Sequence, residues 1–375
     1  MKFRMLVSLI LTASLLFSLP LTCFALNDDA LSLSAKSAIL IDADDRCVLY
    51  EKNATKRLPM ASTTKIVTAL VASELIESER LISIPREAVG IEGSSVYLCE
   101  GELLTVEQLL YALLLESAND AAVALAISAA GSVDAFAKKC NEKAYTLGLG
   151  DTNFTNPHGL YDENHYTSAH DLAILTAEAL RVPLIRKICS TKTARIPLGV
   201  TEGEPNGTGV RHLKNHNKML STYKGAIGVK TGFTKKSGRC LVSAAEIDGL
   251  TLIAVTLDAP DDWQDHTALL DYGFEHYERR TIYGTGEFSY DLPLSNGETA
   301  YVRIKNLSPI RATVKKSAPR HSERIEAYFR FAVAPVSRGQ ILGKLYVTIN
   351  EKTLSSTLVA EDSVEKLSHK SSIFN

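Results

Sequence analysis

Three short groups of residues in this 375-residue chain have the types and order needed for nucleophilic attack on a carbonyl carbon. The first is Ser62 followed by Lys65, at the start of a segment whose apolar residues fit a mostly buried helix. Residues three apart share one face of a helix, so the hydroxyl and the amine are expected to lie side by side. No Ser-His-Asp set is evident, and a serine needs a base to attack. We therefore expect acyl transfer, with Ser62 as nucleophile and Lys65 as base.

The same Ser-x-x-Lys spacing occurs twice more, and only its context separates the three copies. Ser221 and Lys224 lie in a turn-like stretch before Gly225, whereas Ser363 and Lys366 lie in the polar end of the chain. Neither pair opens an apolar helix. We interpret both as chance matches.

The second group is Ser117-Ala-Asn119, whose polar residues interrupt a stretch that is otherwise apolar from Leu109 to Ile127. Buried polar side chains need partners or a function, and alone this group fits a polar contact between helices better than a site. The third group, Lys230-Thr231-Gly232, ends an apolar strand. Glycine there would let a ligand lie against the strand backbone. Alone, it too would be unremarkable.

In this order the three groups resemble the signature shared by penicillin-binding proteins and serine β-lactamases. The chain is similar to the serine D-alanyl-D-alanine carboxypeptidases, which are the low-molecular-mass penicillin-binding proteins of peptidase family S11. The resemblance extends over most of the chain after its leader. It rests on five segments: Leu58–Lys65, Leu115–Ala122, Asn156–Leu160, Gly228–Thr234 and Ala334–Val336.

The resemblance implies a role for each motif residue in cleaving the amide between two terminal D-alanines. Ser62 would form the acyl-enzyme, Ser117 would pass a proton to the leaving amine, and Asn119 would position the substrate. The backbone N–H groups of Ser62 and Phe233 would form the oxyanion hole. The substrate carboxylate would be held by Lys230, Thr231 and Gly232. Lys230 would also be the nearby cation that keeps Lys65 neutral.

Four further residues carry weaker signals. His158 matches a loop beside the active site of the family, and structural and functional interpretations have equal weight. Arg239 follows the strand of the third group and could help to bind a carboxylate, although the sequence favours a structural or surface arginine. His212 and His216 are spaced like a metal pair but lack the accompanying glutamate and fall in a polar stretch, which we expect to be a solvated loop. We expect no metal and no cofactor.

The surrounding pattern predicts an α+β catalytic domain of the β-lactamase/transpeptidase type. A hairpin over residues 37–50, a helical block with helices at 105–130, 132–147 and 168–180, three late strands and a helix at 263–278 would form one antiparallel sheet flanked by helices. Asp248-Gly249 predicts a hairpin turn. The expected domains are 26–280 for catalysis, 281–358 for a small all-β domain resembling a β-sandwich, and 359–375 for a polar tail.

The N-terminus predicts export. Lys2 and Arg4 precede an apolar run and the small-residue pattern Cys23-Phe24-Ala25, so residues 1–25 are interpreted as a signal peptide rather than an uncleaved anchor. We therefore expect the enzyme at the outer face of the cytoplasmic membrane, in the cell wall or in the periplasm of a bacterium. The tail has a thin apolar face and mixed charge, which predicts weak or peripheral membrane contact at most.

Composition excludes several other classes of protein. With 22% charged residues, 45% hydrophobic residues and a net charge of −2, the chain is neither disordered nor suited to nucleic acid as a main partner. Five scattered cysteines remain after the leader, namely Cys47, Cys99, Cys140, Cys189 and Cys240. They do not form a disulfide framework, and one disulfide is left open.

The expected partners are peptidoglycan stem peptides ending in D-Ala-D-Ala and, as covalent inhibitors, β-lactams. A serine β-lactamase is the nearest alternative, but Glu163-Asn164 does not match the deacylation loop of class A enzymes, and the second motif reads Ser-Ala-Asn. A non-catalytic cell-wall-binding module would not need all of the polar residues Ser62, Lys65, Ser117, Asn119 and Lys230. Endopeptidase action on cross-links is not excluded by the motifs.

Overall fold

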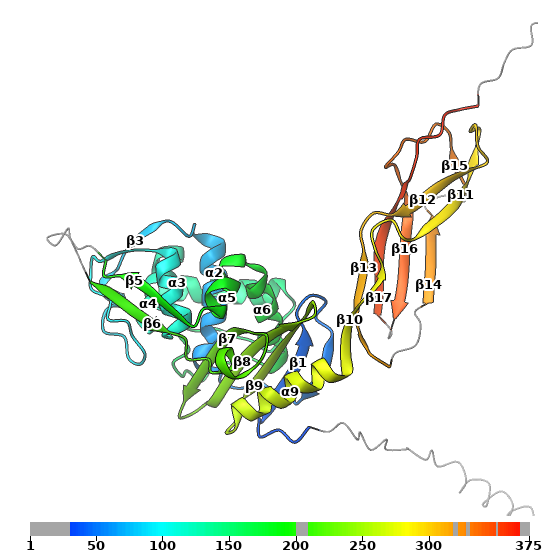
Figure 1. Cartoon of the computed structure of the whole chain (residues 1–375). Coiled ribbons are helices and arrows are strands. Elements are labelled where there is room, and N and C mark those ends of the chain that lie inside the picture. Colours follow the sequence, from blue (N-terminus) through cyan, green and yellow to red (C-terminus); the bar gives the residue numbers. More distant parts are fainter. Residues whose placement is uncertain (1–30, 200–208, 318–321, 328–330, 350–351, 368–375) are drawn as a thin grey trace, which may run out of the picture. The chain divides into compact units, whose positions relative to one another are not determined.

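The protein is described here by a computed structural model (Figure 1). The structure describes residues 31–199, 209–317, 322–327, 331–349 and 352–367. The expected signal peptide at 1–25 and the last eight residues of the tail lie outside this part of the chain. Within it, the fold class is confirmed: helices pack on an antiparallel sheet, and an all-β region follows.

A five-stranded antiparallel sheet in the order β2-β1-β9-β8-β7 joins the two ends of the catalytic region. Its strands are β1 (Ser37–Asp42), β2 (Val48–Lys52), β7 (Ala226–Thr234), β8 (Gly238–Ile247) and β9 (Leu250–Leu257). The predicted first hairpin is β1-β2. The turn at Asp248-Gly249 joins β8 to β9, as expected, and both of its residues have positive φ.

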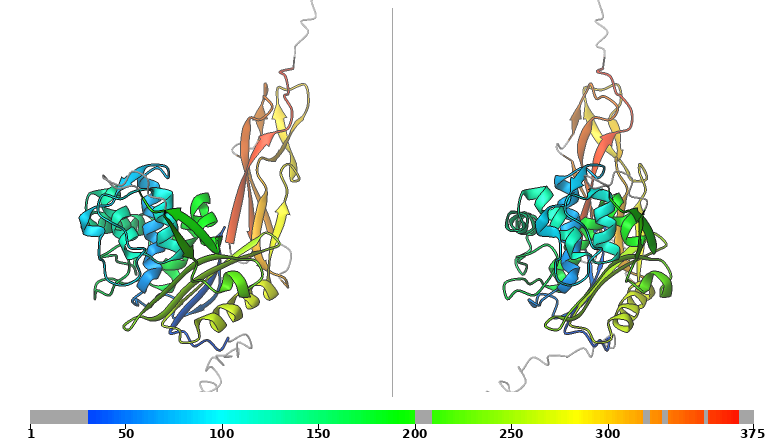
Figure 2. Two further views of the ribbon diagram at one scale, coloured as in Figure 1. Left: turned by 60° about the vertical axis from the view of Figure 1, so that its left-hand side comes forward. Right: turned by 90° about the vertical axis from the view of Figure 1, so that its left-hand side faces the viewer.

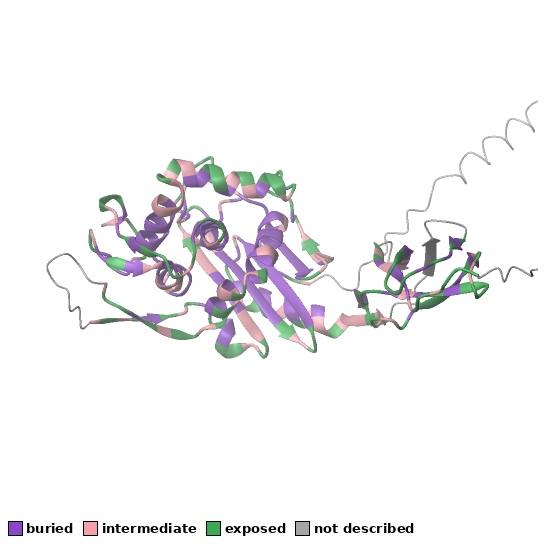
Figure 3. Cartoon of the chain, turned by 90° about the horizontal axis from the view of Figure 1, so that it is seen from above, coloured by how far each residue is buried: buried purple, intermediate pink, exposed green. Residues whose placement is uncertain are grey.

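Helices cover both faces of this sheet. Every residue of β1 and β9 is buried, which requires cover above and below the strands. Helix α9 (Asp262–His276) packs on one face, and α6 (Ala169–Arg181), with the rest of the helical block, packs on the other (Figures 2 and 3). Strands β1 and β9 are therefore enclosed on both faces, while the edge strands β2 and β7 keep partly exposed residues.

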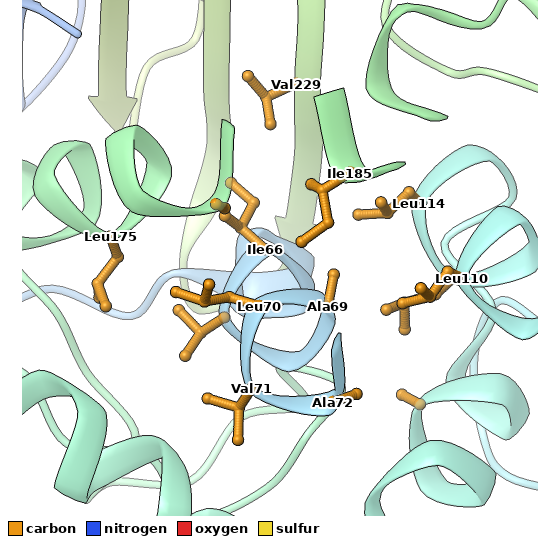
Figure 4. Close-up of a cluster of buried hydrophobic side chains, with 14 of the residues drawn as sticks. Ile66, Ala69, Leu70, Val71, Ala72, Leu110, Leu114, Leu175, Ile185 and Val229 are labelled. Atoms are coloured by element: carbon orange, nitrogen blue, oxygen red, sulfur yellow. The ribbon is translucent and has the colours of Figure 1, made fainter. Parts of the chain in front are cut away.

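Helix α2 (Lys65–Leu75) lies in the middle of the helical block. Its residues Lys65–Ala72 are all buried, and Ile66 and Leu70 point into a cluster with side chains of the neighbouring helices and of β7 (Figure 4). The other helices of the block are α3 (Val106–Leu115), α4 (Asn119–Ala130), α5 (Val133–Thr146) and α7 (Pro183–Ser190). Close packing on every side fixes the position of any polar group that α2 carries.

Two helix predictions need correction. The capping box of Thr105 and Gln108 is present, but the helix that it opens ends at Leu115 instead of continuing to about Ala130. Ser117 has φ +61°, a left-handed conformation that a helix interior does not accommodate, so α4 starts anew at Asn119. Ser62 likewise lies in the 3₁₀ turn η1 (Ala61–Thr64) that precedes α2, rather than in the α-helix itself.

The expectation of a solvated loop was wrong for His212, which lies on a strand, but His216 does lie in a loop with its side chain exposed. Strands β5 (Thr193–Pro197) and β6 (Val210–Lys214) form a hairpin there, and Leu213 and Ile196 are buried. The polar side chains that alternate with them hid this pattern. The remaining short elements are β3 (Leu81–Ser83), η2 (Arg86–Ala88), β4 (Leu103–Thr105) and α8 (Met219–Thr222).

The C-terminal region contains only strands among its described residues. A six-stranded sheet has the order β14-β16-β17-β12-β11-β15, and β10 pairs with β13. Its own apolar cluster includes Val302, Ile304 and Leu345. The strands are β10 (Tyr277–Tyr283), β11 (Ser289–Ser295), β12 (Tyr301–Asn306), β13 (Ile310–Lys315), β14 (Ser322–Ala327), β15 (Ala332–Val333), β16 (Ile341–Ile349) and β17 (Lys352–Ala360).

The described part of the tail after β17 consists of bends and isolated β-bridges. Val364 pairs with Val336, and Lys366 pairs with Gly297, in isolated β-bridges. Of the cysteines, Cys140, Cys189 and Cys240 are buried thiols and Cys99 is an exposed one. Within the described residues no single helix has both the length and the apolar composition of a bilayer span, although α4 and α5 satisfy both together across an 82° bend.

Candidate active site

The turn that presents Ser62 is held by hydroxyl groups of its own residues. Thr63 Oγ1 donates to Met60 O (2.6 Å), and Thr64 Oγ1 donates to Ala61 O (2.8 Å). Ala61 has φ +49°, an unusual conformation for a residue with a Cβ, so the turn depends on such contacts to persist. Ser62 is thereby placed at the N-terminal end of α2, with Lys65 as the first residue of the helix.

The side chain of Lys65 is completely buried, with 0% of its surface exposed. Its Nζ donates to Asn119 Oδ1 (2.7 Å) and to His158 O (2.7 Å), and it lies 3.1 Å from Ser62 Oγ. A neutral amine has two N–H bonds and one lone pair. The two carbonyl-type acceptors can take both N–H bonds, which leaves the lone pair for the Ser62 hydroxyl.

Burial also sets the charge state of this amine. Desolvation lowers the pKa of Lys65 well below its usual range, and the positive charge of Lys230 lowers it further, while Asp120 opposes the shift. Lys230 is itself 1% exposed, and burial lowers its pKa to about 7, with Cys189 and Glu116 acting in the opposite direction. The site therefore holds two lysines in an environment that disfavours their protonation.

The break between α3 and α4 brings the second motif to the same place. Ser117 and Asn119 are buried, and Asn119 Nδ2 donates to Glu92 O (2.5 Å) while its Oδ1 accepts from Lys65. Asp120, 1% exposed, accepts hydrogen bonds from Ser95 Oγ and from the backbone N–H groups of Val96 and Leu98. The helix start thus fixes both a partner of Lys65 and the loop at 94–98.

The third motif lies on β7, which runs directly beside the turn of Ser62. A Cβ added to Gly232 would lie 3.0 Å from Ser62 N and 3.1 Å from Met60 O, which is tighter than most Cβ contacts, so glycine favours this close approach of the strand to the turn. Lys230 Nζ donates to Thr231 O (2.9 Å). Phe233 is 65% exposed, and its side chain stands at the surface beside this strand.

The motifs meet at a cleft of about 380 Å³. Ser62, Ser117, Thr231, Gly232, Phe233 and Arg239 line it, so the structure brings these predicted residues together. Lys65, Lys230 and Asn119 lie buried beneath the cleft floor rather than in the lining itself. Ser221, of the second Ser-x-x-Lys copy, lies on α8, and Ser363 lies in the tail; neither lines the cleft.

The two weaker residues differ in how they meet the site. Arg239 lines the cleft, where its guanidinium pairs with Asp262 (2.9 Å) and lies 6.0 Å from the centre of the Trp263 ring. His158 touches Lys65 through its backbone carbonyl, while its ring Nδ1 accepts from Leu160 N–H (3.2 Å). Burial and the nearby Lys65 lower the pKa of His158 to about 3, so the ring is neutral.

Sequence reasoning missed four residues of the cleft wall: Ser94, His216, Asp262 and Trp263. Glu116 accounts for the placement of His216, because it pairs with the ring (3.3 Å) and accepts from Lys214 N–H (2.5 Å). The sequence analysis considered His216 only as half of a possible metal pair with His212, and no sequence signal placed it at the cleft. Among the described residues, no three His, Cys, Asp or Glu side chains are arranged to hold a metal ion. The expectation that no metal takes part stays a prediction.

Comparison with known families adds two matches. Residues 25–261 match the family model described as D-alanyl-D-alanine carboxypeptidase (Peptidase_S11). Residues 277–366 match the model described as the C-terminal domain of penicillin-binding protein 5. Both regions of the chain are therefore recognised, in the same order as in the predicted organisation.

Individual relatives agree with these matches. The chain is 32% identical over 370 residues to D-alanyl-D-alanine carboxypeptidase DacF of Bacillus subtilis (strain 168), covering 95% of this chain and 93% of the relative. The structure resembles penicillin-binding protein 5 of Haemophilus influenzae with a TM-score of 0.72 and 27% identity, covering 90% and 99% of the two chains. It also resembles the Streptomyces K15 DD-transpeptidase (TM-score 0.61, 32% identity), covering 65% of this chain and 98% of that one.

Proposed function

The chain belongs to the D-alanyl-D-alanine carboxypeptidase family of serine peptidases, and on that premise we propose that Ser62, Lys65 and Ser117 form its catalytic set. The protein is a serine-type carboxypeptidase of the penicillin-binding class, acting on peptidoglycan peptides that end in D-Ala-D-Ala. The observation that carries the assignment of residues is the buried Lys65 amine, 3.1 Å from Ser62 Oγ with acceptors for both of its N–H bonds.

In the first half of the reaction, Ser62 Oγ attacks the carbonyl carbon of the penultimate D-alanine while Lys65 Nζ accepts the hydroxyl proton. The C–N bond then breaks, the proton taken up by Lys65 passes through Ser117 to the leaving amine, and free D-alanine departs. In the second half, water attacks the ester on Ser62 while the neutral Lys65 accepts a proton from it, and Lys65 returns that proton to Ser62 Oγ as the ester bond breaks. The products are the shortened peptide and the regenerated serine.

The remaining motif residues bind the substrate. We assign Lys230, Thr231 and Gly232 to the terminal carboxylate, with Arg239 as a second cation at the cleft wall, and Asn119 to positioning of the peptide. The backbone N–H groups of Ser62 and Phe233 are the oxyanion hole, where donors stabilise the negative charge of the tetrahedral intermediate. His158 supports Lys65 through its carbonyl oxygen.

The β-lactamase alternative would need a carboxylate base dedicated to rapid deacylation, in addition to Lys65. Among the described residues that line the cleft, the carboxylate is Asp262, and it is paired with Arg239. Glu163 is exposed and is not part of the lining. Penicillin should therefore leave a long-lived adduct on Ser62.

Labelling with a fluorescent penicillin, combined with release of D-alanine from a D-Ala-D-Ala peptide, tests the assignment. Ser62→Ala should lose both signals. Ser221→Ala is the matched control, because it removes an exposed serine with the same spacing to a lysine, and it should keep both. Labelling that survives Ser62→Ala would place the nucleophile elsewhere.

We also propose that the protein is exported. The leader at 1–25 supports this, and the mature N-terminus determined by mass spectrometry should be Leu26. The proposed domains are 26–280 for catalysis and 281–358 for the β-domain, followed by the tail at 359–375. The thin apolar face and mixed charge of the tail support weak membrane contact, and its residues 361–367 are bends and isolated β-bridges rather than a helix.

A further inference from the structure

His165 is a buried histidine that the reaction as described does not use. It is 2% exposed, comes from the loop between α5 and α6, and does not line the cleft. The same loop carries His158, whose carbonyl accepts from Lys65, and Pro157, whose carbonyl accepts from Thr68 Oγ1 (2.6 Å). The loop is therefore bonded to the first turns of α2 at several points.

Its hydrogen bonds determine which nitrogen of the His165 ring carries the proton. Thr155 N–H donates to Nδ1 (3.0 Å), so Nδ1 presents a lone pair and Nε2 carries the hydrogen. Nε2 lies 2.8 Å from Thr64 Oγ1 and donates to it. Burial lowers the pKa of His165 to about 4, with the charge of Lys65 acting in the same direction and Asp162 opposing it, so the neutral ring is the stable form.

Thr64 links the His165 ring to the turn that carries the nucleophile Ser62. Its single hydroxyl proton goes to Ala61 O (2.8 Å), and its oxygen is free to accept from His165. Ala61 has φ +49° and directly precedes Ser62, while Thr64 directly precedes Lys65. Gly159 packs against the same carbonyl, because a Cβ there would lie 1.9 Å from Ala61 O. One chain of hydrogen bonds thus runs from Thr155 through the ring to the residue before Ser62.

We propose that His165 is a positioning residue for acylation. By orienting the Thr64 hydroxyl toward Ala61 O, it holds the strained turn in the conformation that points Ser62 Oγ at the Lys65 amine. The proposal rests on acyl transfer at Ser62. It concerns how the nucleophile is oriented and adds no group that touches the substrate.

Two substitutions of His165 by an amide test separately its hydrogen bond with Thr155 and its hydrogen bond with Thr64. In His165→Asn the side-chain oxygen can occupy the place of Nδ1 and accept from Thr155, but nothing reaches Thr64. In His165→Gln the amide nitrogen can occupy the place of Nε2 and donate to Thr64. The rate constant for acylation by a fluorescent penicillin should fall about tenfold or more in the Asn variant and stay within about threefold of wild type in the Gln variant.

Removal of the Thr64 hydroxyl tests the coupling between Thr64 and His165. Thr64→Val should slow acylation about as much as His165→Asn, and the double variant should be no slower than either single variant, since both break the same chain of bonds. The final labelling should reach one penicillin per chain in every variant, which shows that the folded fraction is unchanged. His266→Gln is the matched control: that ring is also fully buried, between Ser243 and Thr256, and its loss should affect stability without slowing acylation.

Wild-type acylation by His165→Asn, equal slowing by the Asn and Gln variants, or independent effects of Thr64→Val and His165→Asn would each overturn the proposal. Failure of the underlying reaction has a different signature, since wild-type protein would then show no adduct on Ser62 at all.

Discussion

Replacing Lys230 by methionine should stabilise the protein at neutral pH while removing its activity. The amine is 1% exposed and its pKa is lowered to about 7 by burial. Holding a lysine at that value, rather than near 10.4 as in an unfolded chain, costs about 4 kcal/mol of folding free energy at pH 7. Losing the hydrogen bond from Nζ to Thr231 O (2.9 Å) costs about 1–3 kcal/mol. The net expected gain is about 2 kcal/mol.

The lowered pKa of Lys230 also predicts how the stability difference between variant and wild type changes with pH. Between about pH 10 and pH 7 the unfolded lysine binds a proton that the folded one does not, so wild-type stability falls as the pH falls through this range. Below about pH 7 both states are protonated and the loss is complete. Methionine has no such penalty, so the advantage of Lys230→Met should be full at pH 7 and should have disappeared near pH 9.5.

Urea unfolding followed by fluorescence measures the difference. Trp263 is the only tryptophan in the sequence and lies in the cleft wall, so its emission reports on the catalytic region. Lys224→Met, which removes an exposed lysine, is the control and should change stability by less than about 0.5 kcal/mol. Two results would refute the electrostatic account of the site. One is a Lys230→Met variant that is less stable than wild type at pH 7. The other is a difference in unfolding free energy between variant and wild type that is the same at pH 7 and pH 9.5.

Four further outcomes are expected. Lys65→Arg should lose more than about 90% of acylation activity, because a guanidinium stays charged at any working pH, and wild-type acylation should fall on acidification as the Lys65 amine becomes protonated. Gly232→Ala should slow acylation of Ser62 by penicillin, because the added Cβ would lie 3.0 Å from Ser62 N; an unchanged rate would show that the turn has room to move. Intact-mass spectrometry should find a penicilloyl adduct lasting minutes or longer, and rapid turnover would favour the β-lactamase alternative. The signal-cleaved protein should bind anionic liposomes weakly, and tight, salt-resistant binding would contradict the assignment of the tail.

Sequence patterns predicted the sheet and the order of its helices because those elements have local signals. The capping box at Thr105, the serine caps at Ser132 and Ser168, and the turn at Asp248-Gly249 all lie where the structure has them. The break at Ser117 could not be predicted in the same way. The segments before Glu116 and after Asp120 are both rich in buried apolar residues with helical spacing, and the polar residues between them do not by themselves show that the backbone turns left-handed at Ser117 instead of continuing the helix.

The cleft floor was easier to predict than its walls. Lys65 and Lys230 belong to compact motifs, and their burial follows from the apolar segments around them. His216 and Trp263, by contrast, reach the cleft through contacts between distant segments, such as Glu116 with His216 and Arg239 with Asp262. Such pairs depend on the packing of β6 and α9 against the motif-bearing elements. A single sequence contains no spacing that reveals them.

The pairing of β1 with β9 has a consequence for how the chain is made. Ser37 lies opposite Leu257, roughly 220 residues later, so the central strand pair of the sheet cannot form until nearly the whole catalytic region has been synthesised. Until then β1 keeps one unpaired edge, and the block around α2 has no platform on its sheet-facing side. A topology with such high contact order folds late and slowly. For a protein that we propose is exported, late folding of the catalytic region keeps the chain unfolded and able to pass through the membrane. The acylating centre then forms only on the far side of the membrane.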